Sequence, residues 1–251
     1  EVKDSSAKTR LIPFEFSTTQ TYIMEFGNQY IRFYKDQGII TESDKTITAI
    51  TKANPGVVTI SSHGFSNGDH VIISSVGGMT EVNNKTFKVA NKTTNTFELQ
   101  NVDGVNVNTS SFTTYSSGGV ANRIYEIASP YNTADLFEIK FAQSADIMYI
   151  VHPSHAIRKL SRTGHTSWTL SAVSITGSPS PALNTGTGKF PSCVTFFEQR
   201  LVFAGSDDNP QTLFFSKSAE LENFTTGTNA TDAMVYSIAS NKVNAIRYLS
   251  A

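Results

Sequence analysis

The side chains best suited to chemistry in this sequence are its histidines: His63, His70, His152, His155 and His165. His152 and His155 are three residues apart and His165 follows ten residues later, so these three are candidate ligands of one metal ion. Pro153 makes the close pair part of a turn, and no Cys, Asp or Glu completes the set at ligand spacing along the chain. We therefore expect no bound metal, and no convergence of the three histidines on a carboxylate.

A phosphate-binding loop is the second candidate, suggested by the run Gly186-Thr-Gly-Lys189. Such a loop needs a glycine five positions before its final glycine, and Leu183 stands there. It also needs Ser or Thr after the lysine, and Phe190 stands there instead. The sequence therefore predicts no phosphate loop.

Paired carboxylates are the third candidate, at Asp207-Asp208 in a polar turn. Neighbouring residues of a turn point apart, whereas glycoside hydrolases hold two carboxyl groups about 5 to 10 Å apart across a cleft. A pair formed in space by distant residues stays possible. No G-x-S-x-G nucleophile motif occurs. We expect a chain that is not an enzyme, with no catalytic, cofactor-binding or metal residues and no cofactor.

The single cysteine and the aromatic residues are expected in the core. Cys193 lies in the apolar stretch Phe190–Phe197, which favours a buried structural thiol, and one cysteine cannot form a disulfide within the chain. Trp168 and the Phe and Tyr clusters could bind sugars or bases, but their spacing is typical of strands that pack into a core.

Composition predicts many short strands. The 251 residues include 17 Phe and much Asn, Thr, Ser and Gly, a mixture suited to strands joined by polar turns. Only 16% of residues are charged and the formal net charge is −1, so no basic surface indicates nucleic-acid binding. No apolar run approaches the roughly 18 residues of a membrane helix. A start without Met and an end within the apolar run 244–251 lead us to expect a larger parent protein.

The order of the predicted elements indicates three parts. A hairpin over 21–26 and 30–34 opens a β-sandwich or barrel platform, formed by residues 1–40 and 123–142. Residues 41–122 are poor in aromatics, and closely spaced strand candidates predict a small β-domain inserted into the platform. Residues 143–251 contain a weak repeat of about 50 residues, which predicts an incomplete β-propeller.

That repeat sets finer expectations. Its copies are Ile147–Leu170 and Leu201–Thr225, in which Trp168 aligns with Phe224, and each copy follows an apolar segment. A third such segment, Val243–Leu249, should start another blade. One short helix is predicted after a cap at Asn132 or Thr133, with Phe137 and Phe141 facing the core. The predicted fold is thus all β with one short helix.

Several runs outside the insert form a recognisable pattern. Those at the start of the chain are Leu11–Phe16, Tyr22–Gly27 and Tyr30–Tyr34. Those that follow the insert are Ser129–Tyr131, Asp135-Leu136, Gln143–Asp146, His152-Pro153, Leu160–Arg162, Trp168, Phe190-Pro191, Arg200–Gly205, Asn209-Pro210, Ser216 and Asn223-Phe224. This pattern resembles tail tubular, nozzle or hub proteins of short-tailed bacteriophages and related prophages.

The insert has a pattern of its own, formed by His63-Gly-Phe65, Asn67-Gly-Asp69, Gly77-Gly-Met79, Asn83, Phe87, Val89, Thr96-Phe97 and Leu99. This pattern resembles the FCCH-like domain, named after the first catalytic cysteine half-domain of ubiquitin-activating enzymes. The segment has no cysteine, so the resemblance implies a fold and no ubiquitin chemistry.

Together the resemblances imply a structural tail protein of the virion, assembled in the bacterial host cytoplasm. It would form a homo-oligomeric ring, usually a hexamer, below the portal and adaptor, and phage DNA would pass through its lumen without sequence-specific binding. A near-neutral chain suits such a conduit. The alternative is a carbohydrate-binding or carbohydrate-cleaving tail protein involved in host attachment.

Overall fold

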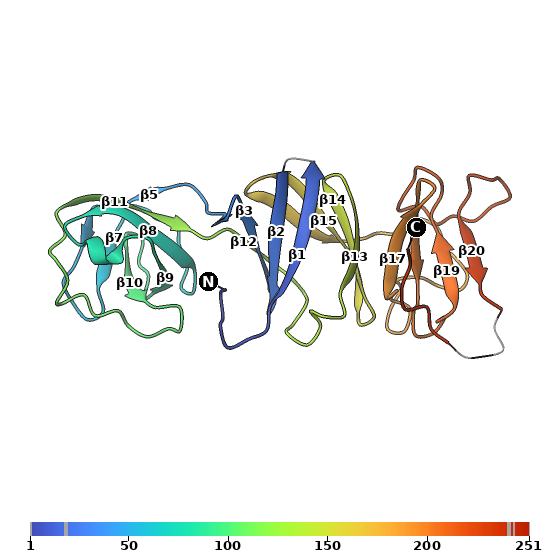
Figure 1. Ribbon diagram of the computed structural model, residues 1–251, viewed down its shortest axis with the longest axis horizontal. Coiled ribbons are helices and arrows are strands. Elements are labelled where there is room, and N and C mark those ends of the chain that lie inside the picture. The colour runs from blue at the N-terminus through green and yellow to red at the C-terminus, as the bar shows by residue number, and fades with distance from the viewer. Residues whose placement is uncertain (1, 18–19, 240–241, 243, 251) are drawn as a thin grey trace. The chain divides into compact units, whose positions relative to one another are not determined.

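The computed structural model describes residues 2–17, 20–239, 242 and 244–250 (Figure 1). It divides into two compact units, of which the first comprises residues 1–8 and 32–126 and the second residues 9–31 and 127–251. The division falls within one strand, Tyr30–Lys35. In the described part of the chain, no helix is long and apolar enough to cross a membrane.

The structure is nearly all β, as predicted. The strands in the N-terminal half of the chain are β1 (Arg10–Ser17), β2 (Gln20–Gly27), β3 (Tyr30–Lys35), β4 (Gly38–Ile39), β5 (Lys45–Thr46), β6 (Ala49–Ile50), β7 (Val57–Thr59), β8 (His70–Gly77), β9 (Lys85–Ala90), β10 (Thr96–Gln100), β11 (Ser117–Arg123) and β12 (Glu126–Ala128). Those that follow are β13 (Lys140–Ser144), β14 (Ile147–His152), β15 (His155–Gly164), β16 (Ser167–Ala172), β17 (Cys193–Phe197), β18 (Arg200–Ala204), β19 (Thr212–Phe215) and β20 (Met234–Ser237). One short 3₁₀ helix, η1 (Thr80–Val82), completes the described elements.

A seven-stranded sheet forms most of the first unit, in the order β5-β11-β8-β9-β10-β7-β6. Alternating side chains of its strands point to one core, as period-two patterns require. The buried members of that core include Val58, Ile73, Val89, Phe97 and Leu99. Four of its strands, β7, β8, β9 and β10, lie in the segment where the sequence predicts closely spaced strands.

Two four-stranded antiparallel meanders, β13-β14-β15-β16 and β17-β18-β19-β20, follow one another in the second unit (Figure 1). They share one hydrophobic core, in which Tyr149 and Val151 of β14 lie with Leu201 and Phe203 of β18. Successive four-stranded meanders are the building unit of a β-propeller. The antiparallel pairing also excludes a parallel β-helix for these strands.

A five-stranded sheet has the order β1-β2-β3-β12, with β4 beside β3. Its strands come from both sides of the predicted insert. The compact units nevertheless divide the chain differently from the predicted parts, because 32–40 groups with the insert and 127–142 with the meanders. The reason for the second difference is local: Lys140–Ser144 pairs with β14 along its whole length.

Three expectations about local structure were wrong. The predicted helix after Asn132 is absent, since 133–138 are turns and Phe137 is exposed. A hydrogen bond from the Glu138 amide to the Asp135 carbonyl makes a single turn, and Lys140 already belongs to β13. The fourth strand of the second meander is β20 rather than 223–225, because Phe224 bonds back to Thr176 instead. Residues 244–250 form no strand, and Val243 lies outside the described residues.

Candidate functional site

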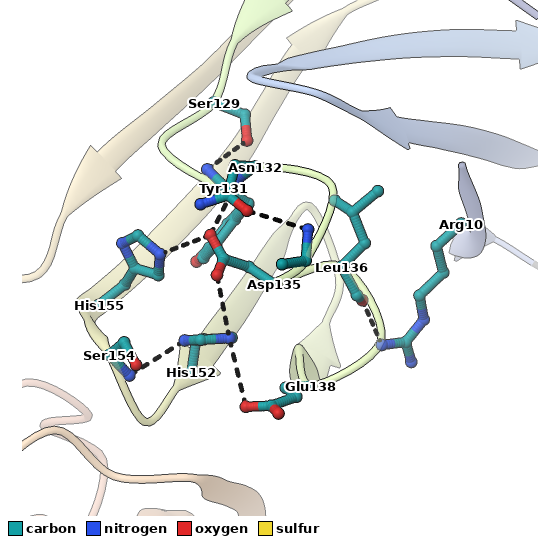
Figure 2. A network of polar contacts seen from close by, with 11 residues as sticks. Arg10, Ser129, Tyr131, Asn132, Asp135, Leu136, Glu138, His152, Ser154 and His155 are labelled. Carbon is teal, nitrogen blue, oxygen red and sulfur yellow. Dashed lines mark hydrogen bonds and ion pairs between the residues drawn. The ribbon is translucent and has the colours of Figure 1, made fainter. Parts of the chain in front are cut away.

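Two of the three later histidines meet a carboxylate. The turn after Tyr131 carries Asp135 and Glu138, and the β14–β15 hairpin carries His152 and His155 (Figure 2). One ligand atom each from Asp135, His152 and His155 lies within 4.8 Å of the others. We call these four side chains the loop–hairpin cluster. The expectation that all three histidines would not converge on a carboxylate therefore does not extend to this pair, which meets Asp135.

Asp135 is the centre of this cluster, and Figure 2 shows it between the two imidazole rings. Its Oδ2 lies 2.9 Å from His155 Nε2 and accepts a hydrogen bond from the Asn132 amide, also at 2.9 Å. Burial acts to raise the pKa of Asp135, but the Asn132 amide and the His155 ring outweigh it, so this pKa lies below its usual value. Asp135 is thus held as a carboxylate.

His152 is almost completely buried, with 2% of its surface exposed. The Ser154 amide donates to its Nδ1 at 3.0 Å, while Nε2 has no hydrogen-bond partner among the described residues. Nε2 faces Asp135 Oδ1 at 3.9 Å and Glu138 Oε2 at 3.7 Å. Burial lowers the pKa of His152, and the charge interaction with His155 adds to this, against the opposite effect of the two carboxylates.

The turn positions these side chains through backbone contacts. Asn132 Oδ1 accepts the Ala134 amide, and Ser129 Oγ accepts the Tyr131 amide. Tyr131 packs edge-on against the His155 ring, with centroids 5.2 Å apart. The Tyr131 ring is fully buried, and burial raises the pKa of its hydroxyl. This packing closes one side of the loop–hairpin cluster.

His165, the third member of the predicted set, lies elsewhere. Its Nδ1 is 2.8 Å from the Tyr22 hydroxyl, and its backbone carbonyl accepts the Trp168 indole N–H at 3.1 Å. Trp168 is buried and packs edge-on against Phe14 and Tyr22, as expected for a core residue. Sequence reasoning missed Asp135 as the partner of His152 and His155 because it comes from a separate turn.

Two other candidates from the sequence, the glycine run at Gly188 and the single cysteine, lie beside charged side chains. The Asp208 amide donates to the Gly188 carbonyl, and its carboxylate lies 3.9 Å from Lys189 Nζ. The glycine run therefore faces an anionic group, which disfavours a bound phosphate. Cys193 is buried, with Lys140 Nζ 3.6 Å from its sulfur.

The glycine and amide positions of the insert also have structural roles. Asn83 bonds both backbone groups of Val76, accepting its N–H at 2.8 Å and donating to its carbonyl at 2.9 Å. Gly78 has φ +78°, and a Cβ there would lie 2.1 Å from the Thr114 carbonyl oxygen. These contacts explain why amide and glycine residues stand at these positions.

A groove of about 560 Å³ lies in the same unit, at the end of β9. Its lining includes hydrogen-bonding side chains and two aromatic rings: Glu81, Asn84, Lys85, Asn101, Phe87 and Phe112. Hydrogen bonds from Thr113 hold the pKa of Glu81 below its usual value. The groove therefore offers a carboxylate and amides beside an apolar surface.

Comparison with known proteins supports the fold of the insert. Residues 53–124 match the family model described as the ubiquitin-activating enzyme E1 FCCH domain, so the predicted FCCH-like domain is confirmed. Over 109 residues the chain is 33% identical to ubiquitin-like modifier-activating enzyme 1 of Oryctolagus cuniculus and 32% identical to that of Homo sapiens. Each match covers 39% of this chain and spans only 10% of the relative.

A solved structure, the phage phi92 endosialidase, is similar over 94% of this chain and 39% of its own, at 14% identity and a TM-score of 0.32. The structure found is named as an enzyme, so the prediction that the chain is not an enzyme is withdrawn. A likeness at this TM-score carries no argument for a particular activity. The match to a family model is limited to residues 53–124, less than half of the chain.

Proposed function

We propose that this chain is part of a bacteriophage tail protein of the virion, which assembles in the host cytoplasm into a closed homo-oligomeric ring. The ring is a hexameric nozzle or hub beside the tail adaptor, and ejected DNA passes through its lumen. The sequence runs that resemble tail tubular and nozzle proteins support this proposal. The net charge of −1 suits a passage that must not hold DNA tightly.

The observation that carries the proposal is the apolar edge of the second meander. β20 is its outermost strand and pairs with β19. The strand and the residue after it expose large apolar side chains: Met234 is 48% exposed, Tyr236 62% and Ile238 44%. Proteins normally cover such strand edges. A neighbouring subunit or a further blade would cover this one.

The mass of the full-length parent protein, in solution and in isolated tails, tests the ring. We expect one closed oligomer, weakened by Tyr236→Lys and by Met234→Lys, because each places a charge at the covered edge. Val105→Lys is the matched control, since Val105 is 62% exposed on a loop of the first unit. A strictly monomeric subunit within assembled tails would refute the proposal.

Glycan binding during host attachment is the second candidate function. It is favoured by the groove of the first unit, where Phe112 lies beside the polar side chains of Glu81 and Asn101. Sugars are bound by aromatic faces together with amides and carboxylates that bond their hydroxyl groups. Whether bound glycan is also cleaved would depend on a second carboxylate at a suitable distance.

Titration with a panel of oligosaccharides, followed by calorimetry, tests this candidate. We expect binding that Phe112→Ala and Asn101→Ala both weaken, while Phe197→Ala in the second unit leaves it unchanged. Phe197 is a suitable control because it is 46% exposed and far along the chain from the groove. Binding that is insensitive to both groove variants would exclude this site.

A further inference from the structure

We propose that Asp135, His152 and His155 bind a divalent transition-metal ion of the zinc class, with Glu138 as the fourth ligand. This site goes beyond the proposed tail function and is independent of it. It rests on the geometry of the loop–hairpin cluster (Figure 2).

The distances within the cluster suit ligands of one metal. Zinc binds nitrogen and oxygen at about 2.1 Å, so two ligands of a tetrahedral site lie about 3.4 Å apart. His152 Nε2 lies 3.9 Å from Asp135 Oδ1 and 3.7 Å from Glu138 Oε2. These separations are too long for hydrogen bonds and need only a small inward movement to hold an ion. The His155 Nε2 to Asp135 Oδ2 separation of 2.9 Å would open slightly.

A second observation points to a ligand at the same place. His152 is 98% shielded, and its Nε2 is a buried polar atom without a hydrogen-bond partner among the described residues. A buried polar group without a hydrogen-bond partner destabilises the folded chain. A metal at the centre of the cluster would give this nitrogen its missing partner.

Metal binding requires a change of tautomer in the imidazole rings of His152 and His155. With Ser154 donating to Nδ1, the proton of neutral His152 is on Nε2. When a metal takes the Nε2 lone pair, that proton moves to Nδ1 and the Ser154 amide turns away. Ser154 is exposed, so water can accept its N–H. His155 makes the same change when its Nε2 leaves Asp135, so we expect weaker binding than in a site that is already open.

The donor set indicates the class of ion. Two imidazoles with two carboxylates suit zinc, and cobalt can replace it as a spectroscopic probe, whereas calcium and magnesium prefer oxygen ligands alone. The ion would join the turn that carries Asp135 and Glu138 to the β14–β15 hairpin. We therefore expect it to stabilise the second unit.

Calorimetric titration of the chain with Zn²⁺ tests the site. We expect one ion per chain, with Kd raised at least about tenfold by Asp135→Asn and by His155→Gln. Glu138→Gln should raise Kd less, because 65% of its side chain is exposed. His165→Gln is the matched control and should leave Kd unchanged. Zinc should also raise the Tm of the parent chain and of the control.

Two outcomes would overturn the proposal. One is the absence of saturable zinc binding, and the other is a Kd that is the same in the unsubstituted chain, in Asp135→Asn and in His155→Gln. Circular dichroism and Trp168 fluorescence show whether each variant is folded. If the first two variants fail to fold, Glu138→Gln decides the question, since an unchanged Kd there together with an unchanged Tm response would reject the four-ligand site.

Discussion

Acidification should destabilise the first unit through His70. This residue begins β8 and is 6% exposed, and neither ring nitrogen has a hydrogen-bond partner among the described residues. Burial lowers its pKa to about 4 from 6.5, and the positive charges of Arg32 and Lys3 add to the effect. The folded chain therefore holds His70 neutral at a pH where the unfolded chain protonates it.

The sign and size of the effect follow from proton linkage. As the pH falls below 6.5 the unfolded state takes up a proton that the folded state refuses until about pH 4, so stability falls through this window and then levels off. The full difference amounts to at most about 3 kcal/mol, and from about pH 7.5 to about pH 5 we expect a loss of about 2 kcal/mol. This contribution is fully present above pH 6.5.

Urea unfolding followed by circular dichroism measures this loss. Trp168 fluorescence reports on the second unit alone, because this sole tryptophan lies in β16. His70→Phe and His70→Gln remove the titrating ring, so both should reduce the pH dependence of the first unit's unfolding free energy by about 2 kcal/mol. His165→Gln is the control and should retain it. An unchanged slope in both His70 variants would refute the reasoning.

Three further predictions concern stability. Arg200 is buried and donates to three backbone carbonyls in the 216–232 segment, so Arg200→Met should cost about 3 kcal/mol in urea unfolding, with Arg200→Lys losing less. Asn83→Ala removes both bonds to the Val76 backbone and should cost about 2 kcal/mol in the first unit, whereas no change would mean that water replaces them. Thr41 pairs with Ile124, so a chain in which a short linker joins these two residues lacks the predicted insert. We expect the remainder to unfold cooperatively when circular dichroism is followed. Loss of cooperative unfolding would count against an insertion.

Local sequence patterns predicted much of the fold. The β-branched run Val71–Ile73 predicts β8, and alternation within 86–89 predicts β9, because a strand with one buried face has a side-chain period of two. The FCCH resemblance rests on residues such as Asn83, whose side chain bonds the backbone of Val76 only 7 residues earlier. Features of this kind are visible in a sequence because the structural requirement and the residues that meet it are close together.

Tertiary structure decided what depends on long-range pairing. The segment after Asn132 has the spacing of apolar residues typical of a helix, yet Lys140–Ser144 pairs with β14 as a strand. The turn that precedes this strand brings Asp135 to His155. Likewise, the strand that closes the second meander is Met234–Ser237 rather than the nearer aromatic segment. The sequence by itself determined the β class, the FCCH-like domain and most of the meander strands, because these follow from local patterns of residues. The loop–hairpin cluster exists only in the folded chain, since it joins a turn and a hairpin that no spacing rule relates.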